Sequence, residues 1–151
     1  MGDEQRQGGV TKLVLFLDEN HCRNPHMIEA IEEYGIVCEK HLDHFQAGTE
    51  DTEWLPVIGQ RKWCLLTTDA RIRRNALEKE AVRASCVRMF YFSRNQLSGK
   101  EMGAALRRAL PRMEKLAQSQ PPPFTASINK SGEVTLRDTF DNIPCDEVEK
   151  S

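Results

Sequence analysis

The stretch KLVLFLDEN, residues Lys12–Asn20, decides the fold class of this chain. After Lys12 the residues are continuously apolar up to Leu17, without the polar alternation of a half-exposed strand. Such a run is typical of a strand buried on both faces of a parallel sheet. Two acids, Asp18 and Glu19, follow it directly. The stretch therefore predicts a buried parallel strand whose carboxyl end carries carboxylates.

Outward from this strand, helix and strand patterns alternate. Asn24 before Pro25 is a helix start, and Gly35 is a helix end. Further strands are expected at Ile36–Cys38, Trp63–Thr67 and Cys86–Phe92. Two further helices are expected, one capped by Thr49 and one over Asn75–Ala84. A third begins with a capping box at Ser98 and Glu101, runs toward Ala117 and is expected to kink at Pro111. Alternation of this kind predicts an α/β fold with a mainly parallel four-stranded sheet. Phe124–Ile128 and Val134–Leu136 predict a small C-terminal β-hairpin.

Composition limits the class of protein. The chain has 151 residues, 39% of them hydrophobic, and a formal charge of −2. No run approaches the roughly 18 apolar residues of a membrane span. We expect a flexible leader (1–11), one domain (12–137) and a disordered acidic tail (138–151). The leader has no apolar core and the five cysteines form no CxxC pair, so we expect a cytoplasmic protein with reduced thiols.

Carboxylates follow two of the apolar strands. Asp18 and Glu19 follow the first, Asp69 follows the third, and Asp51 lies at the start of a helix. Two carboxylates about 4 Å apart repel by around 4 kcal/mol at an effective dielectric constant near 20. A raised pKa or a bound hard cation would offset this cost, and oxygen ligands suit Mg²⁺ or Mn²⁺. Aspartate is also common in loops and helix caps, so the pattern alone leaves a purely local role open.

Four segments, taken in order and spacing, resemble the PIN-like domain family, in particular the compact group associated with VapC-type toxins of toxin–antitoxin pairs. They are Phe16–Asn20, Gly48–Pro56, Leu66–Arg74 and Gln120–Phe124. The resemblance extends from Leu13 to Leu136 and implies a three-layer PIN-like domain. The chain departs from the family pattern at His21-Cys22-Arg23, where leucine and proline are more usual, and at Ala70, where many relatives carry a further acid.

The resemblance also implies an activity, that of a divalent-metal ribonuclease. The positions that match the metal-binding and catalytic acids are Asp18, Asp51 and Asp69, with Glu78 as a fourth catalytic acid and Glu19 or Glu53 as its substitutes. The ion expected is Mg²⁺ or Mn²⁺. The partners implied are an RNA substrate and a protein antitoxin. Asn20 or Thr68 could orient the ligands or a phosphate oxygen.

Three arginines follow Asp69 directly: Arg71, Arg73 and Arg74. They could contact RNA phosphates beside the acidic centre. They could equally form ion pairs with Glu78 and Glu80.

Other functions compete with this one. A non-catalytic PIN-like module would bind RNA or a protein without cleaving. A phosphoacceptor receiver is disfavoured because Phe92-Ser93-Arg94 offers no lysine after the fourth strand. A zinc site made of Cys38, His41 and His44 lacks a fourth ligand. We expect Trp54, Trp63 and the apolar side of the long C-terminal helix to belong to the core, and the helix leaves a homodimer possible.

Overall fold

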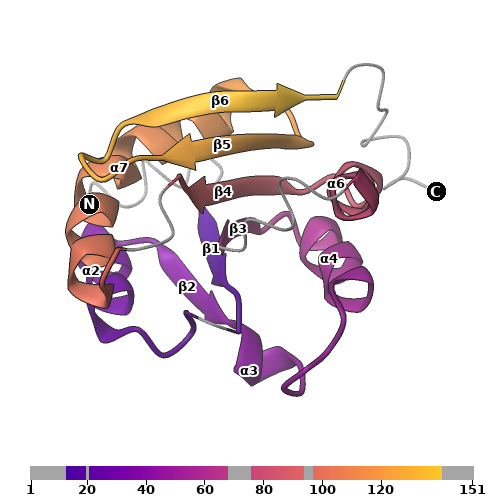
Figure 1. Ribbon diagram of the computed structural model, residues 1–151, viewed down its shortest axis with the longest axis horizontal. Coiled ribbons are helices and arrows are strands. Elements are labelled where there is room, and N and C mark those ends of the chain that lie inside the picture. Colours follow the sequence, from indigo (N-terminus) through magenta and orange to yellow (C-terminus); the bar gives the residue numbers. More distant parts are fainter. Residues whose placement is uncertain (1–12, 20, 68–75, 94–96, 141–151) are drawn as a thin grey trace, which may run out of the picture.

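A six-stranded sheet with helices on both faces forms the molecule (Figure 1). The computed structural model describes residues 13–19, 21–67, 76–93 and 97–140, with only the backbone described for 76–78. In chain order the elements are β1 (Val14–Leu17), α2 (Pro25–Tyr34), β2 (Val37–Lys40), α3 (His41–His44), α4 (Asp51–Gln60), β3 (Cys64–Thr67), α6 (Ala76–Ala84), β4 (Arg88–Phe92), α7 (Gly99–Ser119), β5 (Phe124–Ile128) and β6 (Val134–Thr139). The expected α/β class is confirmed.

The strands lie in the order β2-β1-β3-β4-β5-β6. All neighbouring pairs are parallel except β5 and β6. The expectation of four sheet strands with a separate hairpin is therefore corrected, because the hairpin continues the sheet. All five residues of β5 are buried, and β5 pairs with β4 along its whole length, which satisfies backbone groups that would otherwise form an open edge.

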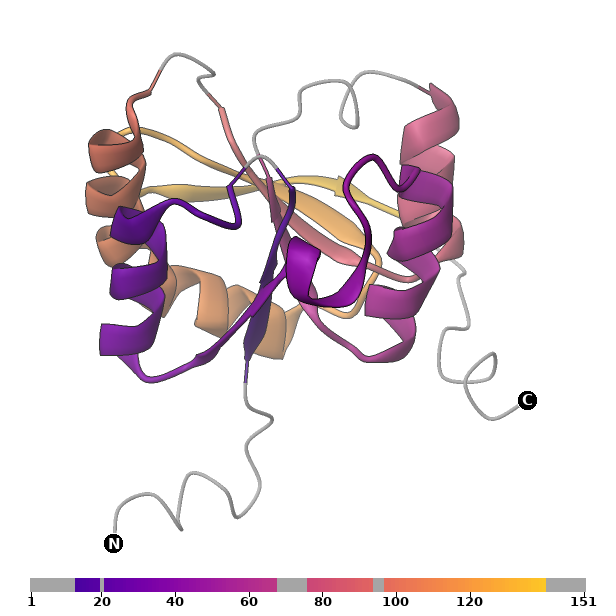
Figure 2. The ribbon, with the colours of Figure 1, turned by 90° about the horizontal axis from the view of Figure 1, so that it is seen from below.

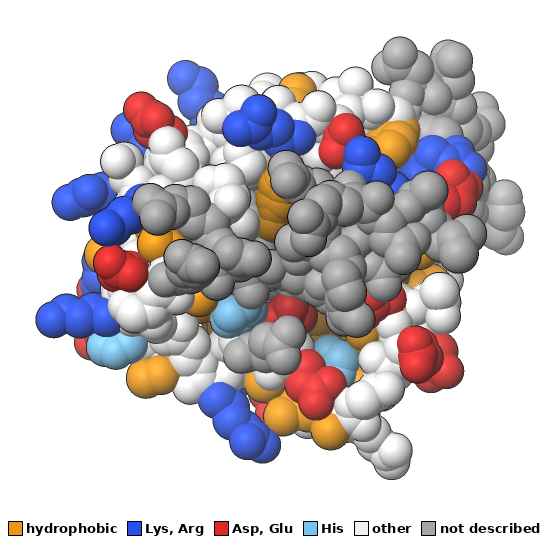
Figure 3. Space-filling view, in the orientation of Figure 1, with side chains coloured by type: hydrophobic (Ala, Val, Ile, Leu, Met, Phe, Trp, Pro, Cys, Tyr) orange, Lys and Arg blue, Asp and Glu red, His pale blue; other side chains and the backbone are white. Residues whose placement is uncertain are grey.

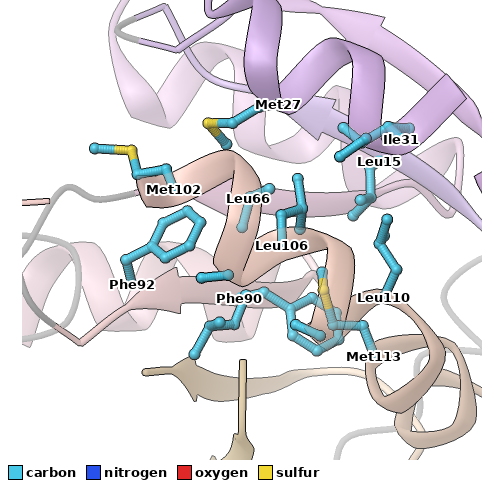
Figure 4. Close-up of a cluster of buried hydrophobic side chains, with 14 of the residues drawn as sticks. Leu15, Met27, Ile31, Leu66, Phe90, Phe92, Met102, Leu106, Leu110 and Met113 are labelled. Carbon is cyan, nitrogen blue, oxygen red and sulfur yellow. The ribbon is translucent and has the colours of Figure 1, made fainter. Parts of the chain in front are cut away.

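The helices form two layers. Helices α2 and α7 pack on one face of the sheet, and α4 and α6 pack on the other (Figures 1 and 2). Alternate residues of each strand enter the two cores, as the pleat requires. On β1, Leu15 and Leu17 face α2 and α7, whereas Phe16 faces α4. Figure 4 shows the larger core, in which Leu106 and Leu110 of α7 lie against Leu66 and Phe90.

Local signals in the sequence set several helix ends. The Asn24 side chain accepts hydrogen bonds from the backbone N–H groups of His26 and Met27, and Gly35 ends α2 with φ +96°. The capping box at Ser98 and Glu101 is also present. The expected cap at Thr49 is wrong, because its hydroxyl donates to the Gln46 carbonyl and α4 begins after Glu50 without a side-chain cap.

The long helix α7 is the largest element of the fold. Pro111 lies inside it, and the helix changes direction along its length (Figure 2). Its residues Met102, Leu106, Leu110 and Met113 are buried, which confirms that this side belongs to the core. Gly103 lies where α7 meets α2, and a Cβ atom there would be 2.6 Å from the Cβ of His26. Only glycine allows the two helices to approach this closely.

The expectations about the cysteines and about the last strand need correction. Cys22, Cys38 and Cys64 are free thiols as expected, but Cys86 is disulfide-bonded. Strand β6 extends to Thr139, three residues beyond the Val134–Leu136 expected for it. The leader, and the tail from 141 onward, lie outside the description. No helix in the described ranges could cross a membrane.

Candidate active site

Asp18 is the best-defined acid of the predicted site. It follows β1 directly, and only 6% of its surface is exposed. Its Oδ2 atom accepts a hydrogen bond of 2.5 Å from the Thr67 hydroxyl at the end of β3. The two residues meet because β1 and β3 are parallel and Leu17 is in register with Leu66. The sheet therefore aligns a buried carboxylate with a hydroxyl donor.

Strand alternation also decides which face of the sheet this pair occupies. Leu66 faces α2 and α7, and Leu65 faces α4 and α6. The next residue, Thr67, therefore points to the α4 and α6 side. Its hydrogen bond places Asp18 Oδ2 on that side as well. The helices that carry Asp51 and Glu78 lie on this same face.

Glu19 connects the end of β1 to the chain that precedes α4. Its Oε1 atom accepts a hydrogen bond of 2.9 Å from the backbone N–H of Gly48. Gly48 has φ +82°, a conformation that favours glycine, and is three residues before Asp51. The same Oε1 atom is 3.8 Å from Nε2 of His41. Glu19 therefore brings the start of α4 to the edge of the sheet where Asp18 lies.

Asp51 is the first residue of α4, and it is half-buried. Glu53 is in the same first turn and is exposed. Acids in this position are stabilised by the positive end of the helix dipole. Acidic and histidine side chains lie side by side on the face shown in Figure 3, over the region where Figure 1 shows the end of β2 and α3.

The remaining predicted residues lie outside the description. These are Asn20, Thr68, Asp69, Arg71, Arg73, Arg74 and the side chain of Glu78, whose backbone belongs to α6. Within residues 13–19, 21–67, 76–93 and 97–140, no three His, Cys, Asp or Glu side chains gather closely enough to hold a metal ion. The expected trio of Asp18, Asp51 and Asp69 therefore stays a prediction.

The alternative zinc site gains no support from its described residues. Cys38, on β2, is half-buried, and burial raises the pKa of its thiol to about 11. His44 binds Glu39 instead, with Nε2 2.7 Å from Oε1. Cys38, His41 and His44 do not appear as a metal-holding group in the described part of the chain. Cys38 and His44 are better explained as parts of the fold.

Sequence reasoning missed the roles of three residues around Asp18 and Glu19. The run Trp63–Thr67 predicts a strand and no further role for Thr67, although a hydroxyl at the end of an apolar strand is a recognisable signal. His41 is almost fully buried, at 1% exposure, which nothing in its neighbouring sequence indicated. His21 is also buried, and burial lowers the pKa of its imidazole. Its backbone N–H donates to the Asp18 carbonyl, so it closes the turn after β1.

The donors present suit a hard divalent cation. Asp18, Glu19 and Asp51 supply carboxylate oxygens, the ligand type that Mg²⁺ and Mn²⁺ prefer. A carboxylate as buried as that of Asp18 loses hydration energy, and a nearby cation offsets this loss. The chemistry of these donors therefore fits such an ion, and Asp18 and Asp51 would hold it together with a further ligand from outside the described residues.

Comparison with models of protein families gives a match. The model of a family described as a PIN like domain matches residues 13–94, which is more than half of the 151-residue chain. The matched range begins at the residue before β1 and ends just after β4, so it contains Asp18, Asp51 and Asp69. Comparison with curated proteins and with solved structures gives no match.

Proposed function

The chain belongs to the PIN-like domain family, and from this premise we propose that it is a divalent-metal-dependent endoribonuclease. A nuclease-type fold is what this membership supports in general terms. The observation that carries the finer proposal is the Asp18 carboxylate. It is buried at the end of β1 and held by the Thr67 hydroxyl where β1 and β3 meet. In open parallel sheets, ligands bind outside the carboxyl ends of the strands, where the order of the strands reverses.

The chain's own residues would do the work of positioning. Thr67 fixes the orientation of the Asp18 carboxylate through one oxygen. Glu19 ties the chain before α4 to the end of β1 through Gly48. Asp51 enters from the first turn of α4. Asp69 is proposed as the third ligand and Glu78 as the outer acid. When bound, Mg²⁺ or Mn²⁺ would supply charge neutralisation at the phosphodiester and would make water a stronger nucleophile.

The substrate would be held beside this acidic centre by cations. We propose Arg71, Arg73 and Arg74 for contacts with RNA phosphates. Such contacts position a nucleic acid without reading its sequence. The chain as a whole is slightly acidic, at −2, so binding has to be local. We also propose that the chain is the toxin of a toxin–antitoxin pair, which would make a small protein antitoxin its partner.

An RNA cleavage assay tests the proposed activity. Purified protein is first treated with a chelator, and a labelled single-stranded RNA is then added with or without Mn²⁺ or Mg²⁺. We expect cleavage only with the ion. Asp18→Asn should lower the rate by at least about a hundredfold, because even residues outside the ligand set cost 10–100-fold.

The matched control is Asp43→Asn, which makes the same change of charge at an exposed position of α3. It should cleave like the parent chain. Equal rates for Asp18→Asn and the parent would refute the assignment of the site. RNA binding without cleavage under every ion condition would instead favour a non-catalytic PIN-like binding module.

A further inference from the structure

His41 is a buried histidine beside the candidate site, and neither the family match nor the proposed reaction gives it a role. It is the first residue of α3 and directly follows β2, whose carboxyl end lies at the same edge of the sheet as that of β1. Its ring packs among Phe16, Phe45 and Trp54, with centroids 5.9, 5.4 and 5.6 Å away. It therefore lies on the α4 side of the sheet, like the pair of Asp18 and Thr67.

The polar atoms of this ring are not satisfied by hydrogen bonds. In the part of the chain that the structure describes, neither Nδ1 nor Nε2 of His41 has a hydrogen-bond partner. Burying a polar group without such a partner lowers stability. An aromatic residue without nitrogen atoms would fill this place without that cost. A histidine at this position is therefore better explained by an interaction of its ring nitrogens than by packing.

The polar group that His41 faces is the Glu19 carboxylate. Nε2 of His41 is 3.8 Å from Oε1 of Glu19, which is too long for a hydrogen bond and short enough for electrostatic attraction. That same Oε1 atom accepts the Gly48 N–H at 2.9 Å. His41 and Gly48 thus act on one oxygen atom from two different segments, and Glu19 is next to Asp18 in the chain.

We propose that His41 is a positioning residue for the candidate metal site. By directing an N–H group at Oε1 of Glu19, it holds that carboxylate against Gly48. The start of α4, with Asp51, is thereby fixed relative to Asp18. This inference rests on the proposed function, because it concerns how the ligands of that function are held in place. His41 itself need not touch the ion or the RNA.

The test compares two substitutions of His41 by Mn²⁺ binding and by urea unfolding. His41→Phe keeps an aromatic ring and removes both nitrogens, whereas His41→Gln keeps an N–H donor near the position of Nε2. The signal of free Mn²⁺ in electron paramagnetic resonance gives the affinity. The fluorescence of Trp54, whose ring contacts His41, gives the unfolding midpoint. His44→Gln, on the exposed part of the same helix, is the matched control.

We expect His41→Phe to weaken Mn²⁺ binding roughly tenfold, as is usual for residues that orient metal ligands. Its urea midpoint should stay equal to that of the parent or rise. His41→Gln should recover most of the affinity, and His44→Gln should bind like the parent. A residue needed only for packing would give the opposite pattern, in which His41→Phe binds Mn²⁺ normally and the midpoint alone moves. That pattern would overturn the proposal.

A double-substitution cycle tests the connection to Glu19. If His41 acts through Glu19, then Glu19→Ala should weaken Mn²⁺ binding in the parent and have little further effect in His41→Phe. Fully additive losses would overturn the connection. Failure of the underlying function has a different signature. If Asp18→Asn binds Mn²⁺ as tightly as the parent, the metal site itself is overturned, and this inference with it. If Asp18→Asn loses Mn²⁺ affinity but His41→Phe binds Mn²⁺ normally, only the role of His41 is overturned.

Discussion

Replacing Thr67 by valine tests the central contact of the candidate site. Valine has nearly the shape of threonine and an equal preference for strands, so the substitution removes the hydroxyl and little else. Thr67 is fully buried, and its hydroxyl donates to Oδ2 of Asp18 over 2.5 Å. The substitution would leave a buried carboxylate with one donor fewer.

The expected loss of stability in Thr67→Val follows from the charge and the burial of the acceptor, the Asp18 carboxylate. Hydrogen bonds to charged groups contribute about 1.5–3 kcal/mol, more than neutral ones. Water cannot easily replace the lost donor, because Asp18 is only 6% exposed. We therefore expect Thr67→Val to lower the free energy of unfolding by about 2 kcal/mol. In a chain of this length, that corresponds to a fall in Tm of about 4–8 °C.

The chain provides a matched control for this experiment. Thr125 of β5 is also fully buried, and its hydroxyl donates to Oδ2 of Asp138 over 2.6 Å. The Asp138 side chain is 29% exposed, however, so water can replace the donor. Thr125→Val should therefore lower the free energy of unfolding by about 1 kcal/mol or less. Urea unfolding followed by tryptophan fluorescence, near pH 7 and without divalent ions, measures both variants.

Two results would refute this reasoning. The first is an equal loss of stability in Thr67→Val and Thr125→Val, which would show that burial of the Asp18 carboxylate is unimportant. The second concerns Asp18→Asn, which removes the charge. If the buried charge causes the loss, then Asp18→Asn should restore stability when added to Thr67→Val. A double variant no more stable than Thr67→Val alone would contradict that explanation.

Further expectations concern the helices and the turn after β1. Gly103→Ala should lower the free energy of unfolding by about 1–3 kcal/mol because its Cβ would clash with His26; an unchanged urea midpoint would contradict this. Asn24→Ala removes the cap of α2 and should cost about 1 kcal/mol in the same assay. Burial lowers the pKa of His21 in the folded chain, so the imidazole binds a proton more readily in the unfolded chain. The free energy of unfolding should therefore fall as the pH drops below 6.5. His21→Asn should make the urea midpoint less dependent on pH, whereas His26→Gln, at an exposed position, should not.

Much of the fold could be predicted from the sequence because its signals are local. The cap at Asn24, the left-handed Gly35 and the capping box at Ser98 depend on residues within one helical turn. The run Leu13–Leu17 predicts a strand buried on both faces for a similar reason, since composition alone distinguishes it from a half-exposed strand. Such features persist whatever the rest of the chain does.

Features that depend on distant residues could not be predicted in this way. The apolar pattern of Phe124–Ile128 predicts a strand, but nothing in it specifies pairing with β4 rather than a separate hairpin. Thr67 gains its role from a residue 49 positions earlier in the chain. The burial of His41 depends on three aromatic rings from separate segments. Each of these requires the sheet order, which the sequence pattern leaves open.

The sheet order explains why the site should lie beside β1 and not elsewhere along the edge. After β1 the chain enters α2 on one face, whereas the helix that follows β3, α6, lies on the other. The chain segments that follow β1 and β3 therefore leave the carboxyl ends of these neighbouring strands toward opposite faces of the sheet. Parallel sheets bind their ligands at such a point. Asp18 and Thr67 occupy that point. A carboxylate buried there loses hydration energy, which the Thr67 hydroxyl offsets in part and a bound cation would offset further, as the proposed function requires.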